Sequence, residues 1–143
     1  MVRIGFDVIG VGVGAMVFNE RGEVFLAQRG PKAKNERGAW EFPGGSVEYG
    51  EKLVDAIRRE FLEEYGMVIA IDELLSVDDH ILPDEGQHWV SPTYIARHIS
   101  GEPRIMEPEK CAAIGWFPLD NLPAPLSVIT QANVAAYQAR ISG

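Results

Sequence analysis

The chain has 143 residues, 46% of them hydrophobic and 24% charged, and a formal net charge of -8 from 21 acidic and 13 basic residues. These values are typical of a globular domain and exclude a disordered or coiled-coil chain. The acidic balance also argues against long nucleic acid as a partner, because its phosphates need many basic side chains, whereas bound cations can admit a small phosphorylated ligand.

The N-terminal part of the sequence predicts two strands joined by a tight turn. Residues Val11–Phe18 and Glu23–Gln28 have strand-like composition, and Gly22 can adopt the positive φ that the turn needs. Residues 10–15 match the spacing of a dinucleotide-binding loop, but that loop requires a strand followed by a helix. Because a second strand follows here, we interpret these glycines as points of close backbone approach within a sheet.

A glycine-rich loop with two lysines, residues 30–38, separates this hairpin from one long helix. The short segment Ala39–Phe42 and the breaker Pro43–Gly45 follow the loop. The segment Glu51–Tyr65 contains neither Gly nor Pro, carries apolar residues at helical spacing and is followed by Gly66, a common C-cap residue. The sequence therefore predicts a helix over residues 51–65.

The second half of the sequence predicts three more strands and a terminal helix. Val68–Val77, Trp89–Ile99 and Cys111–Phe117 have strand-like composition, and the polar segment Asp78–His88 is expected to be a loop rich in turns. Helical spacing of apolar residues over Val128–Ile141 favours a helix. Strands that enclose one helix, with another helix at the end, indicate a mixed α/β sandwich.

Three carboxylates converge on one side of the expected central helix. At 100° per residue, Glu60, Glu63 and Glu64 lie within an arc of about 100°. Glu64 lies only about 20° around the axis from Ile57, so the acids intrude on the apolar face. Such spacing also occurs on a solvated acidic face. Partial burial nevertheless requires a compensating positive charge, and the two helix arginines are expected to point away from Glu64.

A bound divalent cation is the simplest way to compensate this charge. Carboxylate oxygens without Cys or His ligands select hard ions, and Mg²⁺ is often held by one or two carboxylates together with water and substrate phosphates. Mn²⁺ can occupy the same kind of site. The sequence therefore predicts Mg²⁺ or Mn²⁺ at this helix.

Residues 45–67 match the Nudix box, G-x5-E-x7-R-E-U-x-E-E-x-G-U with U a bulky apolar residue, at every defined position. The segments Trp40–Gly44, Leu26–Arg29 and Trp116–Pro123 also resemble that family. The resemblance implies a single Nudix hydrolase domain over residues 1–143. It further implies a Nudix-type α/β/α sandwich with a mixed sheet, one catalytic helix and a C-terminal helix.

The resemblance assigns metal ligands residue by residue. Glu60 and Glu64 correspond to the principal ligands of the family, and Glu63 to a further ligand or a water contact. The backbone carbonyl of Gly44 or Gly45 corresponds to another ligand, and both glycines are expected to lie close to substrate.

The catalytic roles outside the ligands are less fixed by the resemblance. Glu51 either binds metal through water or pairs with Arg59, whose family role is to orient the carboxylates. The implied reaction is attack of water on phosphorus, and the general base often comes from a later loop. Glu107 and Glu109 are the candidates for that base, with a plain surface loop as the alternative.

Two residues before the box are candidates for contact with substrate. Arg29 ends a predicted strand beside the loop with two lysines, so it either donates to a substrate phosphate or is an exposed cation at the strand end. Trp40 either supports a nucleotide base or belongs to the core, as most aromatic residues of such strands do.

The Glu107–Lys110 segment and the Gln87–Val90 segment look most like small MutT-type enzymes. These act on nucleoside triphosphates, in some cases oxidised ones, and release a monophosphate and pyrophosphate. One alternative is hydrolysis of ADP-ribose or another nucleoside diphosphate derivative, which a proline about sixteen residues beyond the box accompanies; Pro83 lies near that position. Another is a nucleotide-binding regulator without catalysis, although such proteins typically have a degraded box and this box is intact.

The expected partners are a small nucleotide and, from the resemblance, a second copy of the chain in a homodimer. Cys111 is the only cysteine, so no internal disulfide can form and a reducing, cytoplasmic setting is expected. No apolar run approaches the roughly 18 residues that a membrane span requires.

Overall fold

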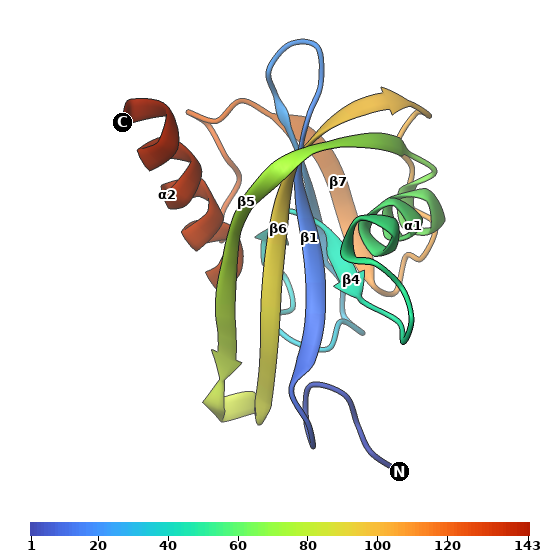
Figure 1. Ribbon diagram of the computed structural model, residues 1–143. Helices are drawn as coiled ribbons and strands as arrows, with labels where there is room; N and C mark the ends of the chain where they lie inside the picture. Colours follow the sequence, from blue (N-terminus) through green and yellow to red (C-terminus); the bar gives the residue numbers. More distant parts are fainter.

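A computed structural model describes residues 1–143 as a mixed seven-stranded sheet with one helix on each side (Figure 1). The expected α/β/α sandwich is therefore confirmed. The strands are β1 (Gly10–Phe18), β2 (Val24–Arg29), β3 (Trp40–Glu41), β4 (Gly44–Ser46), β5 (Val68–Leu82), β6 (Gln87–Ser100) and β7 (Cys111–Phe117); the helices are α1 (Leu53–Tyr65), the one-turn η1 (Pro83–Glu85) and α2 (Val128–Ser142).

Strand β1 lies at the centre of the sheet. It pairs with β6 in the only parallel strand pair of the sheet. It also pairs antiparallel with β4, where Val13 lies opposite Gly45, and meets β2 through the predicted hairpin. Strand β2 pairs in turn with β7 and β3, and β5 pairs with the outer side of β6. Residues 10–15 thus lie within the sheet, as predicted.

Buried side chains fill both faces of the sheet because successive strand residues point to opposite sides. One cluster packs under α1 and includes Ile57 and Phe61 of that helix together with Val13 and Phe25. The other cluster packs under α2, around Met16 and its neighbours. The first cluster matters for function, because it fixes α1 against the sheet and so fixes the acids that α1 carries.

Helix α1 begins at Leu53, so the prediction that it begins at Glu51 was wrong by two residues. Lys52 is extended, with φ -74° and ψ 149°, and Glu51 lies in a turn in which its carboxylate accepts a hydrogen bond from the Glu48 backbone. At the other end Gly66 adopts φ 67° and its N–H donates to the Leu62 carbonyl. The predicted C-cap is therefore confirmed.

The expected loop over Asp78–His88 is wrong. Strand β5 continues to Leu82 and β6 already begins at Gln87, so only η1 and Gly86 form the turn. Ladder pairing to β6, including Asp79 opposite Val90, outweighs the low strand preference of the polar residues. The two strands form an arm that projects from the body of the molecule (Figure 1).

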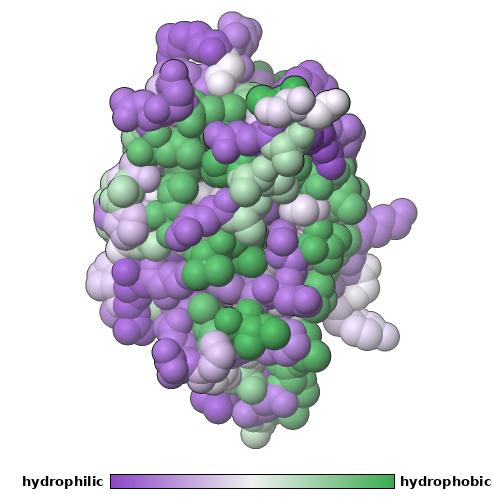
Figure 2. All heavy atoms as spheres, turned by 90° about the vertical axis from the view of Figure 1, so that its left-hand side faces the viewer, coloured by the Kyte–Doolittle hydropathy of each residue, from purple (hydrophilic) through white to green (hydrophobic).

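The outer face formed by α2 and β5 mixes hydrophobic and hydrophilic side chains (Figure 2). Exposed apolar residues of these two elements include Leu74, Val77 and Ile81 of β5 and Ile141 of α2. Neither α1 nor α2 has the length and apolar content of a helix that crosses a membrane.

Candidate functional site

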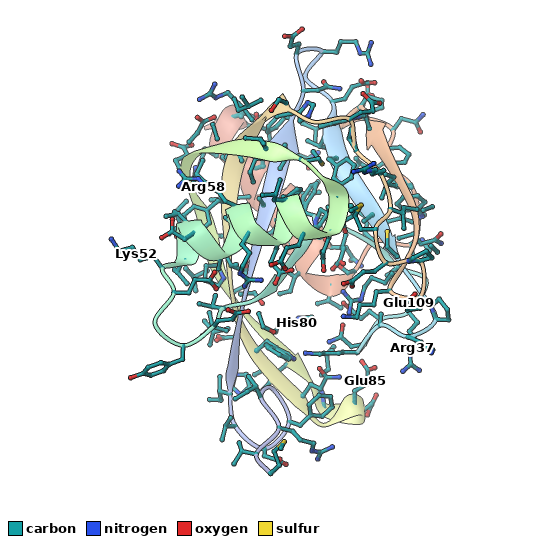
Figure 3. All side chains as sticks on the ribbon, turned by 90° about the vertical axis from the view of Figure 1, so that its right-hand side faces the viewer. Arg37, Lys52, Arg58, His80, Glu85 and Glu109 are labelled. Carbon is teal, nitrogen blue, oxygen red and sulfur yellow. The ribbon has the colours of Figure 1, made fainter.

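A cavity of about 340 Å³ opens between α1, the loop of residues 30–38, the β5–β6 arm and the start of α2. Figure 3 views this opening, with His80 near its centre. The volume is in the range of small-molecule sites. Its lining includes carboxylates (Glu36, Glu41, Glu60, Glu64 and Glu107), cations (Arg29, Lys32, Lys34 and Lys110) and hydroxyl or amide side chains (Asn35, Ser46, Ser91, Thr93, Ser127, Thr130 and Asn133).

Helix α1 places two of the three predicted helix acids in the cavity. Its core residues Ile57 and Phe61 are fully buried, so Glu60 and Glu64 beside them are drawn partly out of water. Glu63 does not line the cavity, and its side chain is 60% exposed. The predicted intrusion of acids on the apolar face is therefore confirmed for Glu60 and Glu64.

Gly45 lies directly against Glu60. A Cβ atom at position 45 would overlap the Glu60 carboxylate, and one at Gly44 would overlap the carbonyl oxygen of Val13. Only glycine can therefore bring this backbone so close to both the helix acid and strand β1. Both glycines line the cavity, as the resemblance implies for a backbone carbonyl near metal and substrate.

Arg59 binds three acids of the Nudix-box segment, one before the helix and two on it. Its Nε and Nη2 atoms lie 2.7 and 2.9 Å from the two oxygens of Glu51, and its Nη1 lies 3.0 Å from Glu60 and 3.3 Å from Glu63. The hydrogen bonds from Arg59 lower the pKa of Glu51 to about 2. Of the two alternatives for Glu51, the structure shows the pairing with Arg59.

Glu64 has no such partner. Arg59 serves the other acids and Arg58 pairs with Asp55 at 3.6 Å, so neither helix arginine reaches Glu64, as predicted. Burial raises the pKa of Glu64 to about 8, and the neighbouring carboxylates, first Glu60, add to this rise. Burial likewise raises the pKa of Glu60, although Arg59 opposes it. The Glu60–Glu64 pair therefore favours binding either a proton or a cation.

The donors in this corner suit a hard divalent ion. Carboxylate oxygens of Glu60 and Glu64 and the backbone at Gly45 share the cavity wall. No three acidic, histidine or cysteine side chains converge on one point as a complete coordination sphere. Mg²⁺ commonly completes its sphere with water, backbone carbonyls and substrate phosphates, so two carboxylates fit such a site.

Arg29 lies inside the cavity, so the alternative of an exposed cation at the strand end is wrong. Its Nη1 atom lies 3.0 and 2.9 Å from the two oxygens of Glu41, and its Nε donates to the Asn35 carbonyl at 2.7 Å. Burial raises the pKa of Glu41, although Arg29 pulls it down. Glu41 was not predicted as a site residue. It follows Trp40 in a strand and therefore faces the opposite side of the sheet, which was the available signal.

Of the three remaining candidate residues, only Glu107 lines the cavity. Trp40 does not line the cavity; its ring packs edge-on against Phe117 at 5.3 Å on the α2 side of the sheet, which is the core alternative. Glu107 lines the cavity, whereas Glu109 is exposed and turned outward (Figure 3). Of the two candidates for a general base, only Glu107 is thus in reach of a ligand.

The end of the cavity near α2 is polar and includes the carboxylate of Glu36, which accepts from the Val128 N–H at 3.0 Å. Asn133 donates to Thr93 at 3.0 Å, and Thr130 accepts from the Phe42 backbone at 3.1 Å. His80 lies 3.6 Å from Glu36, and its buried Nε2 has no hydrogen-bond partner. These residues were not predicted from the sequence, because the loop of residues 30–38, β5, β6 and α2 bring them together from distant positions.

The profile of the NUDIX domain matches residues 8–138. Over 115 residues, 78% of this chain, the sequence is 35% identical to the mouse (Mus musculus) 8-oxo-dGDP phosphatase NUDT18, and it is 36% identical over 94 residues, 64% of this chain, to an ADP-ribose pyrophosphatase of Methanocaldococcus jannaschii. The matches span about a third (33%) and about half (54%) of those relatives. A crystal structure of a MutT NUDIX hydrolase from Burkholderia pseudomallei superposes with a TM-score of 0.83 at 41% identity, covering 90% of this chain and 97% of that one.

Proposed function

This chain belongs to the NUDIX family, and from that premise we propose that it hydrolyses the diphosphate linkage of a small nucleotide with the help of Mg²⁺ or Mn²⁺. The preferred substrate is a nucleoside triphosphate, canonical or oxidised, which is split into a monophosphate and pyrophosphate. One observation supports the proposal most strongly. Glu60 and Glu64 lie together beside Gly45 in a cavity of suitable size, and no basic side chain compensates the charge of Glu64.

Each residue has a role that follows from its position. Glu60 and Glu64 hold the ion with help from the Gly45 backbone, and Arg59 keeps Glu60 oriented through the hydrogen bond at 3.0 Å. A bound divalent ion would lower the pKa of water and neutralise charge on the phosphoryl oxygens. Arg29, which donates to Glu41 in the structure, donates instead to a substrate phosphate when the nucleotide is bound.

Glu107 is the proposed acceptor of the proton from the attacking water. It lines the cavity together with Glu64, and its neighbour Glu109 does not. A general base must come within hydrogen-bond reach of the proton it takes, so position in the cavity decides between the two. No covalent intermediate with the protein is needed.

Two alternatives remain distinct from this proposal. Hydrolysis of ADP-ribose has a relative of that name in its favour, but Pro83 lies in η1 at the tip of the arm and does not line the cavity. A regulator that binds nucleotides without hydrolysis would not need Glu64 kept in a position that burial makes unfavourable.

A substrate panel tests the proposal. The wild-type protein is assayed with Mg²⁺ and Mn²⁺ on canonical and oxidised deoxynucleoside triphosphates, ADP-ribose, NADH and nucleotide sugars, and the products are resolved. We expect a monophosphate plus pyrophosphate from triphosphates. Glu64→Gln should be inactive, whereas Glu85→Gln, at the exposed tip of the arm (Figure 3), should retain activity.

The outcomes separate the alternatives. Turnover confined to ADP-ribose would replace the preferred substrate but keep the chemistry. Nucleotide binding without hydrolysis of any compound would favour the regulator.

A further inference from the structure

Basic residues are concentrated on one wall of the cavity. Four of the 13 basic residues of this acidic chain line it, and three of them are lysines: Lys32, Lys34 and Lys110. Arg29 is paired with Glu41, and Lys110 lies 3.4 Å from Glu107. Lys32 and Lys34 form no ion pair, so their charges are available to a ligand.

The loop that carries Lys32 and Lys34 is held on both flanks. On one side the Gly30 N–H donates to the Lys110 carbonyl at 2.8 Å and the Lys32 N–H donates to the Glu109 carbonyl at 2.9 Å. These two bonds join the loop to the segment that precedes β7. The position of Lys32 at the mouth is therefore fixed by the backbone.

On the other flank the loop is joined to β6. The buried amide of Gln87 donates to the Lys34 carbonyl at 2.9 Å and accepts from Asn35 at 3.0 Å. The Lys34 ammonium lies over the Trp89 ring, 5.4 Å from its centre. Buried polar side chains of this kind are costly unless they are satisfied, so the bracing is a built feature rather than a solvated surface loop.

The two walls of the cavity therefore differ in charge. The α1 wall presents Glu60 and Glu64, which suit a cation, and the loop wall presents Lys32 and Lys34, which suit an anion. Glu36 of the same loop also lines the cavity, but its carboxylate accepts from the Val128 N–H at 3.0 Å and lies 3.6 Å from His80 Nε2. A phosphate that links two groups carries about one negative charge, whereas a terminal phosphate carries up to about two near neutral pH. The loop wall is therefore best matched to a phosphate chain with a free end.

We propose that Lys32 and Lys34 form a subsite for the terminal phosphate of the substrate. This subsite selects nucleotides with a free phosphate end over nucleotides whose diphosphate is capped by a second sugar. The proposal rests on the proposed function, since it assigns the substrate class of the same cavity. Because both lysines are exposed, their contribution is mainly to binding, and salt should weaken it.

The test compares the double variant Lys32→Gln/Lys34→Gln with the control Lys52→Gln. Lys52 has the same charge, is exposed at the start of α1 and does not line the cavity (Figure 3). For a nucleoside triphosphate with Mg²⁺, the double variant should lose about tenfold in kcat/KM, mostly through KM, given the modest strength of exposed ion pairs. For ADP-ribose the same variant should lose less than about twofold, and the control should lose nothing on either.

A second readout does not depend on turnover. Calorimetric titration with inorganic pyrophosphate and Mg²⁺ should show binding to the wild type and the control, with affinity about tenfold lower in the double variant. Equal losses on triphosphate and ADP-ribose, no loss beyond that of the control, or no binding of pyrophosphate by the wild type would overturn the subsite. Pyrophosphate binding that depends on the lysines in a protein that hydrolyses nothing would instead overturn the proposed function and leave the subsite standing.

Discussion

The two walls of the cavity carry opposite charges and are built in different ways. The acidic wall belongs to α1, which the buried Ile57 and Phe61 fix against the sheet. The basic wall belongs to a loop that a few hydrogen bonds from Gln87 and the backbone hold in place. The difference agrees with the proposed roles, in which the core-packed helix holds the metal in a fixed geometry and the loop binds phosphate mainly through charge.

A second contrast lies between two acids of the Nudix box, Glu51 before α1 and Glu64 within it. Glu51 meets the two-pronged Arg59 guanidinium, which lowers the pKa of Glu51 to about 2. Glu64 meets no cation, and burial raises its pKa to about 8. Carboxyls whose environments push their pKa values apart have different functions. Here Glu51 is held by Arg59, and Glu64 is the proposed metal ligand.

The largest effect is expected from Glu64→Gln. Loss of a metal ligand should lower metal-dependent turnover by about two to three orders of magnitude, a size typical of removing one group that stabilises transition-state charge. The variant should unfold at the same or a higher temperature, because a buried carboxylate has been removed. Steady-state kinetics and thermal unfolding in EDTA measure both. An active variant would rule out Glu64 as a ligand.

Glu51→Gln should have an intermediate effect. It leaves Arg59 free to turn away from Glu60, so we expect a loss of about 10- to 100-fold in kcat, as for other groups that orient metal ligands. Unlike Glu64→Gln, it should also lower the unfolding temperature. A loss of stability with normal kcat in the folded protein would mean that Arg59 does not orient Glu60.

Gln87→Met should have a smaller effect on activity. This effect should come from the basic wall, where Gln87 holds the loop that carries Lys34. It removes the hydrogen bonds to Lys34, Asn35 and the Trp89 indole, at a cost of about 1–3 kcal/mol in the free energy of unfolding. If that bracing positions the lysines, KM for a triphosphate should rise about threefold while kcat stays constant, because only binding is lost. A fall in kcat alone would contradict the division of labour between the walls.

The smallest effect is expected in the pH dependence of stability without metal. This dependence should distinguish Glu51 from Glu64. Glu64 has a raised pKa in the folded state, so its ionisation costs stability as pH rises from about 4.5 to about 8. Glu51 has a lowered pKa, so its contribution is present above about 4.5 and is lost as pH falls towards 2. Unfolding temperatures in EDTA should fall towards pH 8 in the wild type, and Glu64→Gln should show a smaller decline, to which Glu60 and Glu41 still contribute because burial also raises their pKa values.

Sequence reasoning was most successful where the decisive contacts are local. The spacing within α1 places Glu60 and Glu64 on one side regardless of the rest of the chain, and Gly66 ends the helix by its own conformation. It failed where the pairing of distant strands decides the local structure. Asp79 and His80 look like loop residues, yet pairing with β6 makes them part of a strand and turns His80 towards the cavity.

The same limit explains why the basic wall was only partly foreseen. Arg29 was a candidate, but its partner Glu41 comes from the neighbouring strand β3. The bracing of Lys34 depends on Gln87, which is 53 residues away in the sequence. Contacts of this separation are set by the fold of the whole chain and leave no local pattern.

The central claim is that Glu60 and Glu64 hold a divalent cation beside Gly45. Titration with Mn²⁺, followed by electron paramagnetic resonance of the free ion, measures this without any substrate. We predict that the wild type and Glu85→Gln bind Mn²⁺ with equal affinity, and that Glu60→Gln and Glu64→Gln each bind it at least about tenfold more weakly. Equal Mn²⁺ binding by all four folded proteins would contradict the claim.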